Sequence, residues 1–329
     1  MTTSQLRPFE CVLCKSSGNA LRIASAVKGD PSGALSAVRC PTCGHVQLYP
    51  PEYDLGFYEQ DGQVANVVSG YGTAMEKLFE HSWIEARRRV DRFAKHGIDV
   101  LARGADLRLL DVGGGYGLFA AEMLRRVPGA KVTVLEPSTT RIEIGRGEIA
   151  ATGDPSIMPL FDPALLDERY VEAHAGTFDL VTMWHVLEHL PDPIDLLRLA
   201  MRLLRPGTGK LCVEVPNFAD DLMDLSPAYR ARHFMAEHVS YFSPNALEAT
   251  ARWADPDAIV AVHGYQRYGI YNYFHWAHFN SPQGANPDMF PGADRWWLET
   301  AWRAAKESTR TSDALFMTIE PRPQKPPVA

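Results

Sequence analysis

Two pairs of closely spaced cysteines lie near the start of the chain. Cys11 and Cys14 form the first C-x-x-C pair, and Cys40 and Cys43 form the second. Each C-x-x-C turn directs two sulfurs toward one point, and two such turns supply the tetrahedral four-thiolate site that Zn²⁺ prefers. Because four protein thiolates leave no coordination position for water, the spacing predicts a structural zinc site.

Other interpretations of these cysteines stay open. The pairs could be free or redox-active thiols, although nothing around them resembles a thioredoxin unit. His45 adjoins the second pair and could replace one cysteine as a ligand. The remaining cysteine, Cys212, lies far downstream in an apolar run and is expected in the core.

A glycine-rich segment, LDVGGGYG (110–117), ends an apolar run that reads as a strand. Glycines let the backbone turn sharply and approach a ligand without a Cβ in the way. A helix would begin at this turn, so its free N–H groups would face the ligand. Asp111 could accept a hydrogen bond from a cationic amino group, and Glu136, ending the next strand, could bind two ribose hydroxyls.

These features are common to folds that bind NAD and folds that bind S-adenosylmethionine (SAM). The spacing here is G-x-G-x-G, formed by Gly113, Gly115 and Gly117. Leu118 occupies the position where the dinucleotide fingerprint requires its third small residue. An NAD(P)-dependent oxidoreductase is therefore the disfavoured alternative.

A histidine-containing segment, HFMAEHVSYFSP (233–244), offers acid–base chemistry. Glu237 adjoins His238, and a carboxylate beside an imidazole can orient it as a general base with a pKa near working pH. Tyr241 offers a phenol for hydrogen bonding or proton relay. His189, in LEHLPDP, competes for the role of base. For each histidine the alternative is a surface or capping residue.

An alternation of strands and helices is expected to position these residues. Apolar periodicity predicts a long amphipathic helix over 73–96. The alternation that follows predicts a parallel sheet covered by helices on both faces. The connections around 147–170 and 217–240 show no clear pattern. The expected strands are 107–113, 131–137, 178–186, 209–217 and 258–265, and the expected helices are 118–127, 139–148, 192–204 and 244–254.

The chain is long enough for one large domain and an accessory module. We expect a zinc module over 1–60 and a catalytic domain over 61–329, with a linker near 53–72 and a disordered Pro-rich tail. The catalytic domain would consist of a core, an aromatic-rich inserted cap and an antiparallel last strand (75–262, 265–312 and 313–321).

Four motifs resemble, in order and spacing, those of class I SAM-dependent methyltransferases. They are DVGGGYG (111–117), LEP (135–137), FDLVTMWHVLEHLPDP (178–193) and LRPGTGKLCVEVPN (204–217). The resemblance covers residues 75–262 and implies a Rossmann-like, seven-stranded, mostly parallel sheet with SAM as the cofactor. A methyl sulfonium is already activated, so such a protein mainly aligns the reactants and excludes water.

The resemblance also implies roles for individual residues. Asp111 and the three spaced glycines would hold the methionine end of SAM. Glu136, followed by Pro137 in the LEP motif, would hold the ribose. Three further residues would border the cofactor: Asp162, near the adenine, His185, and Trp184, which could equally be a packing residue.

The cysteine module, the methyltransferase motifs and EHVSYFS together resemble the sugar methyltransferases of deoxysugar and glycan pathways. In the C-methylating branch an aromatic residue and a histidine are expected where this chain has Met235 and Ala236. That difference favours a sugar hydroxyl over a carbon as the methyl acceptor. The alternatives are a methyltransferase for a polyketide, lipid or other non-sugar metabolite, and a zinc-ribbon binding protein without catalysis.

Charge and hydropathy bear on the partners. The formal net charge is −7, and the densest basic run, Arg87, Arg88 and Arg89, is flanked by acidic residues, which disfavours nucleic acid. No apolar stretch approaches the ~18–20 residues that span a bilayer, and the first residues lack the layout of a signal peptide. We therefore expect a cytoplasmic monomer or homodimer that acts on a small molecule.

Overall fold

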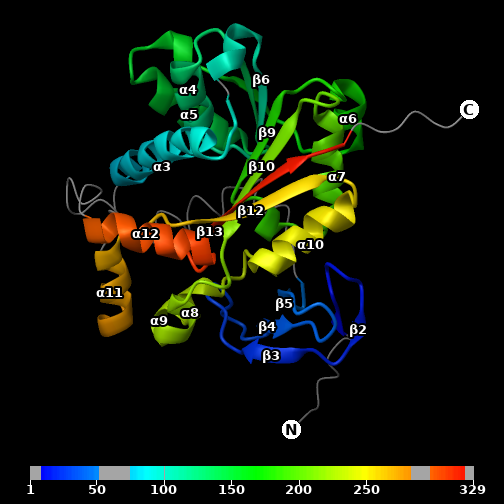
Figure 1. Cartoon of the computed structure of the whole chain (residues 1–329), viewed down its shortest axis with the longest axis vertical. Coiled ribbons are helices and arrows are strands. Elements are labelled where there is room, and N and C mark those ends of the chain that lie inside the picture. The colour runs from blue at the N-terminus through cyan, green and yellow to red at the C-terminus, as the bar shows by residue number, and fades with distance from the viewer. Residues whose placement is uncertain (1–8, 52–74, 100, 283–296, 323–329) are drawn as a thin grey trace, which may run out of the picture. The chain divides into compact units, whose positions relative to one another are not determined.

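The structure, a computed structural model, describes residues 9–51, 75–99, 101–282 and 297–322 (Figure 1). The expected linker and nearly all of the expected tail lie outside these residues. The chain divides into two compact units. Unit 1 comprises Met1–Tyr53, His185–Leu197 and Val213–Thr318, and unit 2 comprises Asp54–Trp184, Arg198–Cys212 and Ile319–Ala329.

The main sheet has seven strands in the order β12-β13-β10-β9-β6-β7-β8. β6 pairs in parallel with β7 and β9, and β7 pairs in parallel with β8. The expected Rossmann-like, mostly parallel sheet is confirmed. The strands are β6 (Arg108–Val112), β7 (Lys131–Leu135), β8 (Leu160–Asp162), β9 (Leu180–Trp184), β10 (Lys210–Pro216), β12 (Ile259–Tyr265) and β13 (Ala314–Glu320).

The central strands are buried along nearly their whole length. All five residues of β9 are buried, as are four of the five residues of β6. A parallel strand covered on both faces needs a continuous apolar run rather than alternation. This is why runs such as LRLLDV were recognisable in the sequence.

In unit 2, α4 (Leu118–Arg126) packs against α3 (Met75–Lys95) and α5 (Thr139–Ala150). Phe93 of α3 contacts Phe119 of α4 edge to face, with ring centroids 6.0 Å apart. The long amphipathic helix expected over 73–96 is thus present. A short 3-10 helix, η1 (Leu101–Asp106), leads into β6.

Residues 147–170, where the sequence showed no clear pattern, contain ordered elements. After the last turn of α5 come η2 (Pro155–Ile157), β8 and the start of α6 (Glu168–His174). β8 has three residues and α6 has seven, so neither is long enough to show a clear period. The side chain of Asp167 caps α6 by accepting a hydrogen bond from the Tyr170 amide at 2.8 Å.

Unit 1 contains the helices of the C-terminal half. Ser243 caps α10 and Pro244 is its first residue, as the sequence predicts. α12, within the expected cap, carries buried Lys306, whose ammonium lies 3.0 Å from the Asp220 carboxylate. The helices are α8 (Leu222–Leu225), α9 (Pro227–His233), α10 (Pro244–Ala254), α11 (Ile270–Phe279) and α12 (Trp297–Thr309), and α7 (Pro193–Leu203) has residues in both units.

Two small sheets, also in unit 1, form the N-terminal module. β1 (Phe9–Glu10) pairs with β2 (Ser17–Gly18), and a second sheet has the order β11-β5-β4-β3. Its strands are β3 (Leu21–Ala24), β4 (Ser36–Arg39), β5 (Val46–Tyr49) and β11 (Ser240–Tyr241), the first three shown in blue in Figure 1.

The strand β11 comes from the histidine-containing segment and completes the sheet of the module. β11 pairs antiparallel with β5, and the Leu48 amide donates to the Val239 carbonyl at 2.9 Å. Lys28 and Met235 form a further bridge. The module therefore fixes the backbone on both sides of His238.

Among the described residues, none of the helices combines the length and the hydrophobicity that crossing a bilayer requires.

Candidate functional site

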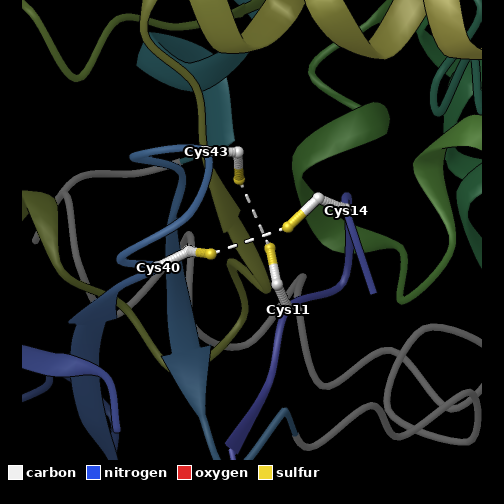
Figure 2. A group of neighbouring side chains, drawn as sticks. All are labelled: Cys11, Cys14, Cys40 and Cys43. Carbon is white, nitrogen blue, oxygen red and sulfur yellow. Dashed lines mark hydrogen bonds between the residues drawn. The ribbon is translucent and has the colours of Figure 1, made fainter. Parts of the chain in front are cut away.

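The four cysteines of the two C-x-x-C pairs converge, with their sulfurs directed at one point (Figure 2). The Cys11 and Cys43 sulfurs lie 3.6 Å apart, as do those of Cys14 and Cys40. Zn–S bonds of ~2.3 Å at tetrahedral angles place sulfurs about 3.8 Å from one another. The cluster therefore has the dimensions of a four-thiolate zinc site.

The surroundings of Cys40 favour a thiolate. Burial raises the pKa of its thiol, but hydrogen bonds from the Ser16 hydroxyl and from the amides of Cys43 and Thr42 outweigh burial and lower the pKa to about 6. The Ser16 hydroxyl lies 3.3 Å from the Cys40 sulfur. Burial raises the pKa of Cys43 to about 11 and also raises the pKa of Cys11, so the lowered pKa is a property of Cys40 that these two thiols do not share.

His45, the alternative ligand, has a different contact. Its Nε2 atom lies 3.2 Å from the Ser240 hydroxyl, and its ring packs on Phe242 with centroids 5.5 Å apart. Burial lowers the pKa of His45 to about 3, so the imidazole is neutral. His45 thus links β11 to the module and stands outside the cysteine cluster, which is formed by the four thiols alone.

In unit 2 the glycine-rich turn joins β6 to α4, and Asp111 lies beneath it. Its Oδ1 atom accepts a hydrogen bond from the Thr182 hydroxyl at 2.7 Å. Its buried Oδ2 atom has no hydrogen-bond partner in the described part of the chain and would lie 2.5 Å from a Cβ at Gly114. Only glycine fits there. Burial raises the pKa of Asp111 to about 7, although Thr182 and Arg89 oppose the rise.

Glu136 ties the end of β7 to the same turn. Its carboxylate accepts hydrogen bonds from the amide of Gly115 at 2.9 Å and from the amide of Ser138 at 3.0 Å. The Arg141 guanidinium lies 3.8 Å away. An ionised carboxylate has about four lone-pair sites, so Glu136 retains capacity for two hydroxyl donors.

The other cofactor candidates of unit 2 lie at adjacent strand ends. The Glu136 amide, just before Pro137, donates to the Asp162 carbonyl at 3.1 Å. Gly117 has φ of 74°, and a Cβ there would approach Phe161 to 2.6 Å. Gly113 also has positive φ. The carboxyl ends of β6, β7 and β8 thus gather the predicted residues where open α/β sheets bind ligands.

Trp184, the last residue of β9, is a packing residue of unit 2. Its ring lies 4.8 Å from that of Phe119 and 6.0 Å from that of Phe93, measured between centroids. The Arg89 guanidinium lies 5.0 Å from the ring centroid. Trp184 is buried, with 6 % of its surface exposed.

His185, the next residue, belongs to a charged network of unit 1. Its Nδ1 atom lies 3.1 Å from Glu188, and its Nε2 atom lies 3.0 Å from Glu214 and 2.9 Å from the Arg267 guanidinium. Burial opposes protonation, but hydrogen bonds to the two carboxylates raise the pKa of His185. Its φ of 58° is uncommon for a residue with a side chain. Such a backbone conformation is strained and persists because the surrounding contacts hold it in place.

Next to this network, Glu188, His189 and His238 form a compact cluster of unit 1. All three are buried, and one side-chain donor atom of each lies within 4.8 Å of the others. The two imidazole rings meet edge to face with centroids 4.8 Å apart. The sequence named both histidines as rivals for one role, whereas the structure places them side by side.

The charge states of this cluster follow from its burial and its neighbours. Burial lowers the pKa of His238 well below its usual value, and the adjacent His189 adds to this, so the imidazole is neutral. Burial raises the pKa of Glu188, but the hydrogen bond with His185 outweighs burial and lowers the pKa to about 2. The cluster thus combines an ionised carboxylate with a neutral imidazole.

Glu237 and Tyr241 contribute to this region through the backbone. The Glu237 carbonyl accepts a hydrogen bond from His189 Nδ1 at 2.8 Å. The Tyr241 hydroxyl donates to the Met235 carbonyl at 2.9 Å and accepts from the Met235 amide at 3.1 Å. Burial raises the pKa of Tyr241. These contacts hold the turn that carries His238.

Sequence reasoning missed Glu188, Glu214 and Arg267 as parts of the site. Glu214 is fully buried in the middle of β10, and a charged residue inside an apolar strand was the available signal. Arg267 follows β12 and is held by Asp313, 3.2 Å away. No local pattern marks Arg267, because its partners come from distant segments.

Residues 85–255, more than half of the 329 residues, match a family described as a methyltransferase domain. The chain belongs to this family. The match includes the glycine-rich turn of unit 2 and both histidines of the unit 1 cluster. The resemblance to class I SAM-dependent methyltransferases is therefore confirmed for this domain.

Curated relatives align with a shorter part of the chain. A ubiquinone biosynthesis O-methyltransferase of Sodalis glossinidius is 37% identical over 99 residues, which are 30% of this chain and 37% of that protein. One of Paracidovorax citrulli is 34% identical over 110 residues, which are 33% and 44%. The chain thus spans less than half the length of these two relatives. Neither of the two is named as a sugar methyltransferase.

Solved structures of other methyltransferases are similar to this chain at low identity. An O-methyltransferase family protein from Burkholderia thailandensis is 16% identical, with 82% of this chain and 64% of that chain covered and a TM-score of 0.49. A phosphoethanolamine N-methyltransferase of Haemonchus contortus is also 16% identical, with coverage of 66% and 49% and a TM-score of 0.40. At such identities the likeness concerns the fold alone.

Proposed function

We propose that the protein transfers the methyl group of SAM to a hydroxyl of a small-molecule acceptor, most simply a sugar derivative. The observation that carries the proposal is the methyltransferase domain match over 85–255, which contains an intact glycine-rich turn with buried Asp111 and Glu136. Thermal-shift screening with SAM, S-adenosylhomocysteine and NAD tests the cofactor class. A shift with NAD alone would contradict the proposal.

On the cofactor side, each residue has a proposed task. Asp111 accepts from the ammonium of the methionine end, while Gly113, Gly115 and Gly117 let the backbone approach it. Glu136 accepts from the ribose hydroxyls. When bound, SAM supplies an activated methyl group, and the protein orients it and excludes water. Pro137, Asp162 and His185 remain proposed neighbours of the cofactor.

Replacing Glu136 by alanine is expected to weaken SAM binding by about 1–3 kcal/mol, because charge-assisted hydrogen bonds to the ribose are lost. Calorimetry measures the change. Glu143→Ala is the matched control, since Glu143 is an exposed carboxylate on the neighbouring helix α5. Unchanged affinity in Glu136→Ala would remove the ribose assignment.

The affinity for SAM is expected to fall as the pH drops below 7. The ammonium of SAM pairs with ionised Asp111, whose pKa of about 7 in the unliganded protein leaves the carboxyl half protonated at that pH. Affinity is therefore full at higher pH and approaches a tenfold loss per unit well below the pKa, at roughly 1.4 kcal/mol per unit. Titration calorimetry between pH 5.5 and 8.5 measures this slope, and Asp111→Asn should abolish it.

On the acceptor side, we assign proton removal to the buried histidine pair, with His238 as the first choice and His189 as its competitor. The acceptor oxygen bonds to the methyl carbon as the carbon–sulfur bond breaks. The acceptor proton passes to His238, and S-adenosylhomocysteine leaves. Burial lowers the pKa of His238, which keeps the imidazole neutral and able to accept a proton but makes it a weaker base than the expected pKa near working pH would give. Glu237 and Tyr241 are proposed to position it.

The nature of the acceptor is the finer part of the proposal. The module that completes its sheet with β11, together with the EHVSYFS segment, supports a sugar hydroxyl. The relatives named ubiquinone biosynthesis O-methyltransferases support a second candidate, an acceptor of that pathway. Mass spectrometry of products from nucleotide sugars and from ubiquinone precursors distinguishes the two, and a methylated sugar is the expected result.

We also propose that the four cysteines bind a structural Zn²⁺. Their sulfur spacing supports it. The metal would stabilise a module of two small sheets and, through the pairing of β5 with β11, the turn that carries His238.

A further inference from the structure

We propose that Glu188, His189 and His238 bind a second metal ion, a divalent transition-metal cation, at a site separate from the four cysteines. This inference rests on the proposed function, because it gives the histidine pair a different means of assisting proton loss. With the cation bound, His238 would be a ligand of the cation, which would hold the acceptor oxygen. The inference therefore keeps the proposed methyl transfer and replaces the assignment of His238 as the base.

The three side chains come from two segments that the fold holds together. Glu188 and His189 lie in the 3-10 helix η3 (Leu187–His189), which packs beside β11, and His238 lies two residues before β11. Their donor atoms lie within 4.8 Å of one another. Bonds of ~2.1 Å to one cation would draw these atoms to about 3–4 Å apart.

The orientation of His189 is that of a metal ligand. Its Nδ1 atom lies 2.8 Å from the Glu237 carbonyl, which can only accept a hydrogen bond, so Nδ1 carries the proton. The lone pair then lies on Nε2, the atom on the side of Glu188, 3.9 Å from its carboxylate. Metal-bound histidines are held in this way by a carbonyl or carboxylate behind the ring.

A buried carboxylate oxygen provides the second observation. Glu188 is 1 % exposed, and its Oε1 atom contacts His185. Its Oε2 atom has no hydrogen-bond partner within the described residues. A carboxylate oxygen without a hydrogen-bond partner keeps its lone pairs available to a cation.

The donor set indicates which cations fit. Two imidazoles and one carboxylate suit Zn²⁺, Fe²⁺, Co²⁺ or Mn²⁺ rather than Ca²⁺, which takes oxygen ligands. Three protein ligands leave coordination positions open, unlike the closed four-thiolate site. An acceptor hydroxyl bound there would lose its proton to solvent more easily, and its oxygen would then bond to the methyl carbon as the carbon–sulfur bond breaks.

Manganese titration followed by electron paramagnetic resonance tests the proposal, and the sample is full-length protein that carries one zinc per chain, in the four-cysteine site. Mn²⁺ prefers oxygen and nitrogen ligands and competes poorly for thiolates, so it reports on the second site alone. We expect one Mn²⁺ per chain, with affinity at least about tenfold weaker in Glu188→Gln and His238→Ala. His278→Ala, which removes an exposed histidine of α11, should bind as the wild type does.

Retention of zinc by each variant reports that unit 1 is folded. Absence of Mn²⁺ binding in the wild-type protein, or equal binding in zinc-retaining Glu188→Gln and His238→Ala, would overturn the inference. Methyl transfer is measured on the same samples. Methylation that continues in a protein that binds no Mn²⁺ would leave the proposed function intact, whereas Mn²⁺ binding without methylation of any acceptor would support the metal site and count against the proposed function.

Discussion

Replacing His238 by alanine is expected to lower kcat by about 10²–10⁴-fold while SAM affinity changes by less than about threefold. The imidazole is buried and neutral beside His189 and Glu188, in the form that takes a proton or binds a cation. The residues proposed for SAM binding, Asp111 and Glu136, belong to unit 2 and are untouched by the change. Single-turnover kinetics and calorimetry measure the two quantities separately.

Comparison with His189→Ala distinguishes a single base from a cation that both histidines bind. If His238 alone accepts the proton, His189 only positions it, and its loss should cost about tenfold less in kcat than the loss of His238. If the inferred cation is shared, the two variants should fall alike, and this is the result we expect. Near-normal turnover in His238→Ala with loss in His189→Ala would move the role of base to His189.

Glu237→Gln is a further control, because the structure uses the Glu237 carbonyl and not its carboxylate to hold His189. This variant should retain most of the activity. A loss as large as that of His238→Ala would mean that the Glu237 carboxylate takes part directly, as its position next to His238 in the sequence suggests.

The strands of the parallel sheet could be predicted from the sequence because burial on both faces requires continuous apolar runs. The helix α10 was predicted to the residue, since Ser243 and Pro244 mark its start chemically. The strand β8 and the helix α6 could not be found, because three and seven residues show too little periodicity. Tertiary pairing with β7, rather than local preference, makes β8 a strand.

Some parts of the candidate site could likewise be predicted from the sequence and others could not. The cysteine cluster and the glycine-rich turn are set by residues close in sequence, so spacing alone predicted them. The cluster of Glu188, His189 and His238 joins segments about 50 residues apart, through the hydrogen bond between His189 and the Glu237 carbonyl and the packing of η3 beside β11. A pattern search along one chain shows two rival histidines, whereas the fold makes them neighbours.

The role of the N-terminal module follows from this pairing. Its strand β5 lies between β4 and β11, so the turn that carries His238 is anchored to the module by backbone hydrogen bonds. The buried contact between His45 and Ser240 adds a side-chain link. A zinc ion in the module would therefore affect methyl transfer without touching either reactant.

Replacing Cys40 by serine is expected to remove the structural zinc and unfold the module. The variant is best made in a Glu188→Gln background, which lacks the inferred second cation site and should carry one zinc per chain. A structural Zn²⁺ contributes roughly 10–16 kcal/mol to folding, which exceeds what two small sheets can supply on their own. Metal analysis should then fall from one zinc per chain to nearly none.

Hydrogen exchange shows whether loss of the metal also destabilises the turn that carries His238. The amides of Leu48 and Ala236, which bond the carbonyls of Val239 and Lys28, should lose their protection in Cys40→Ser. Cys212→Ala in the same background is the control, because it removes a thiol that lies outside the cluster. Zinc retained in Cys40→Ser, or zinc lost equally in Cys212→Ala, would contradict the four-thiolate site. Zinc loss with these two amides still protected would mean that β11 holds its place on β5 without the metal.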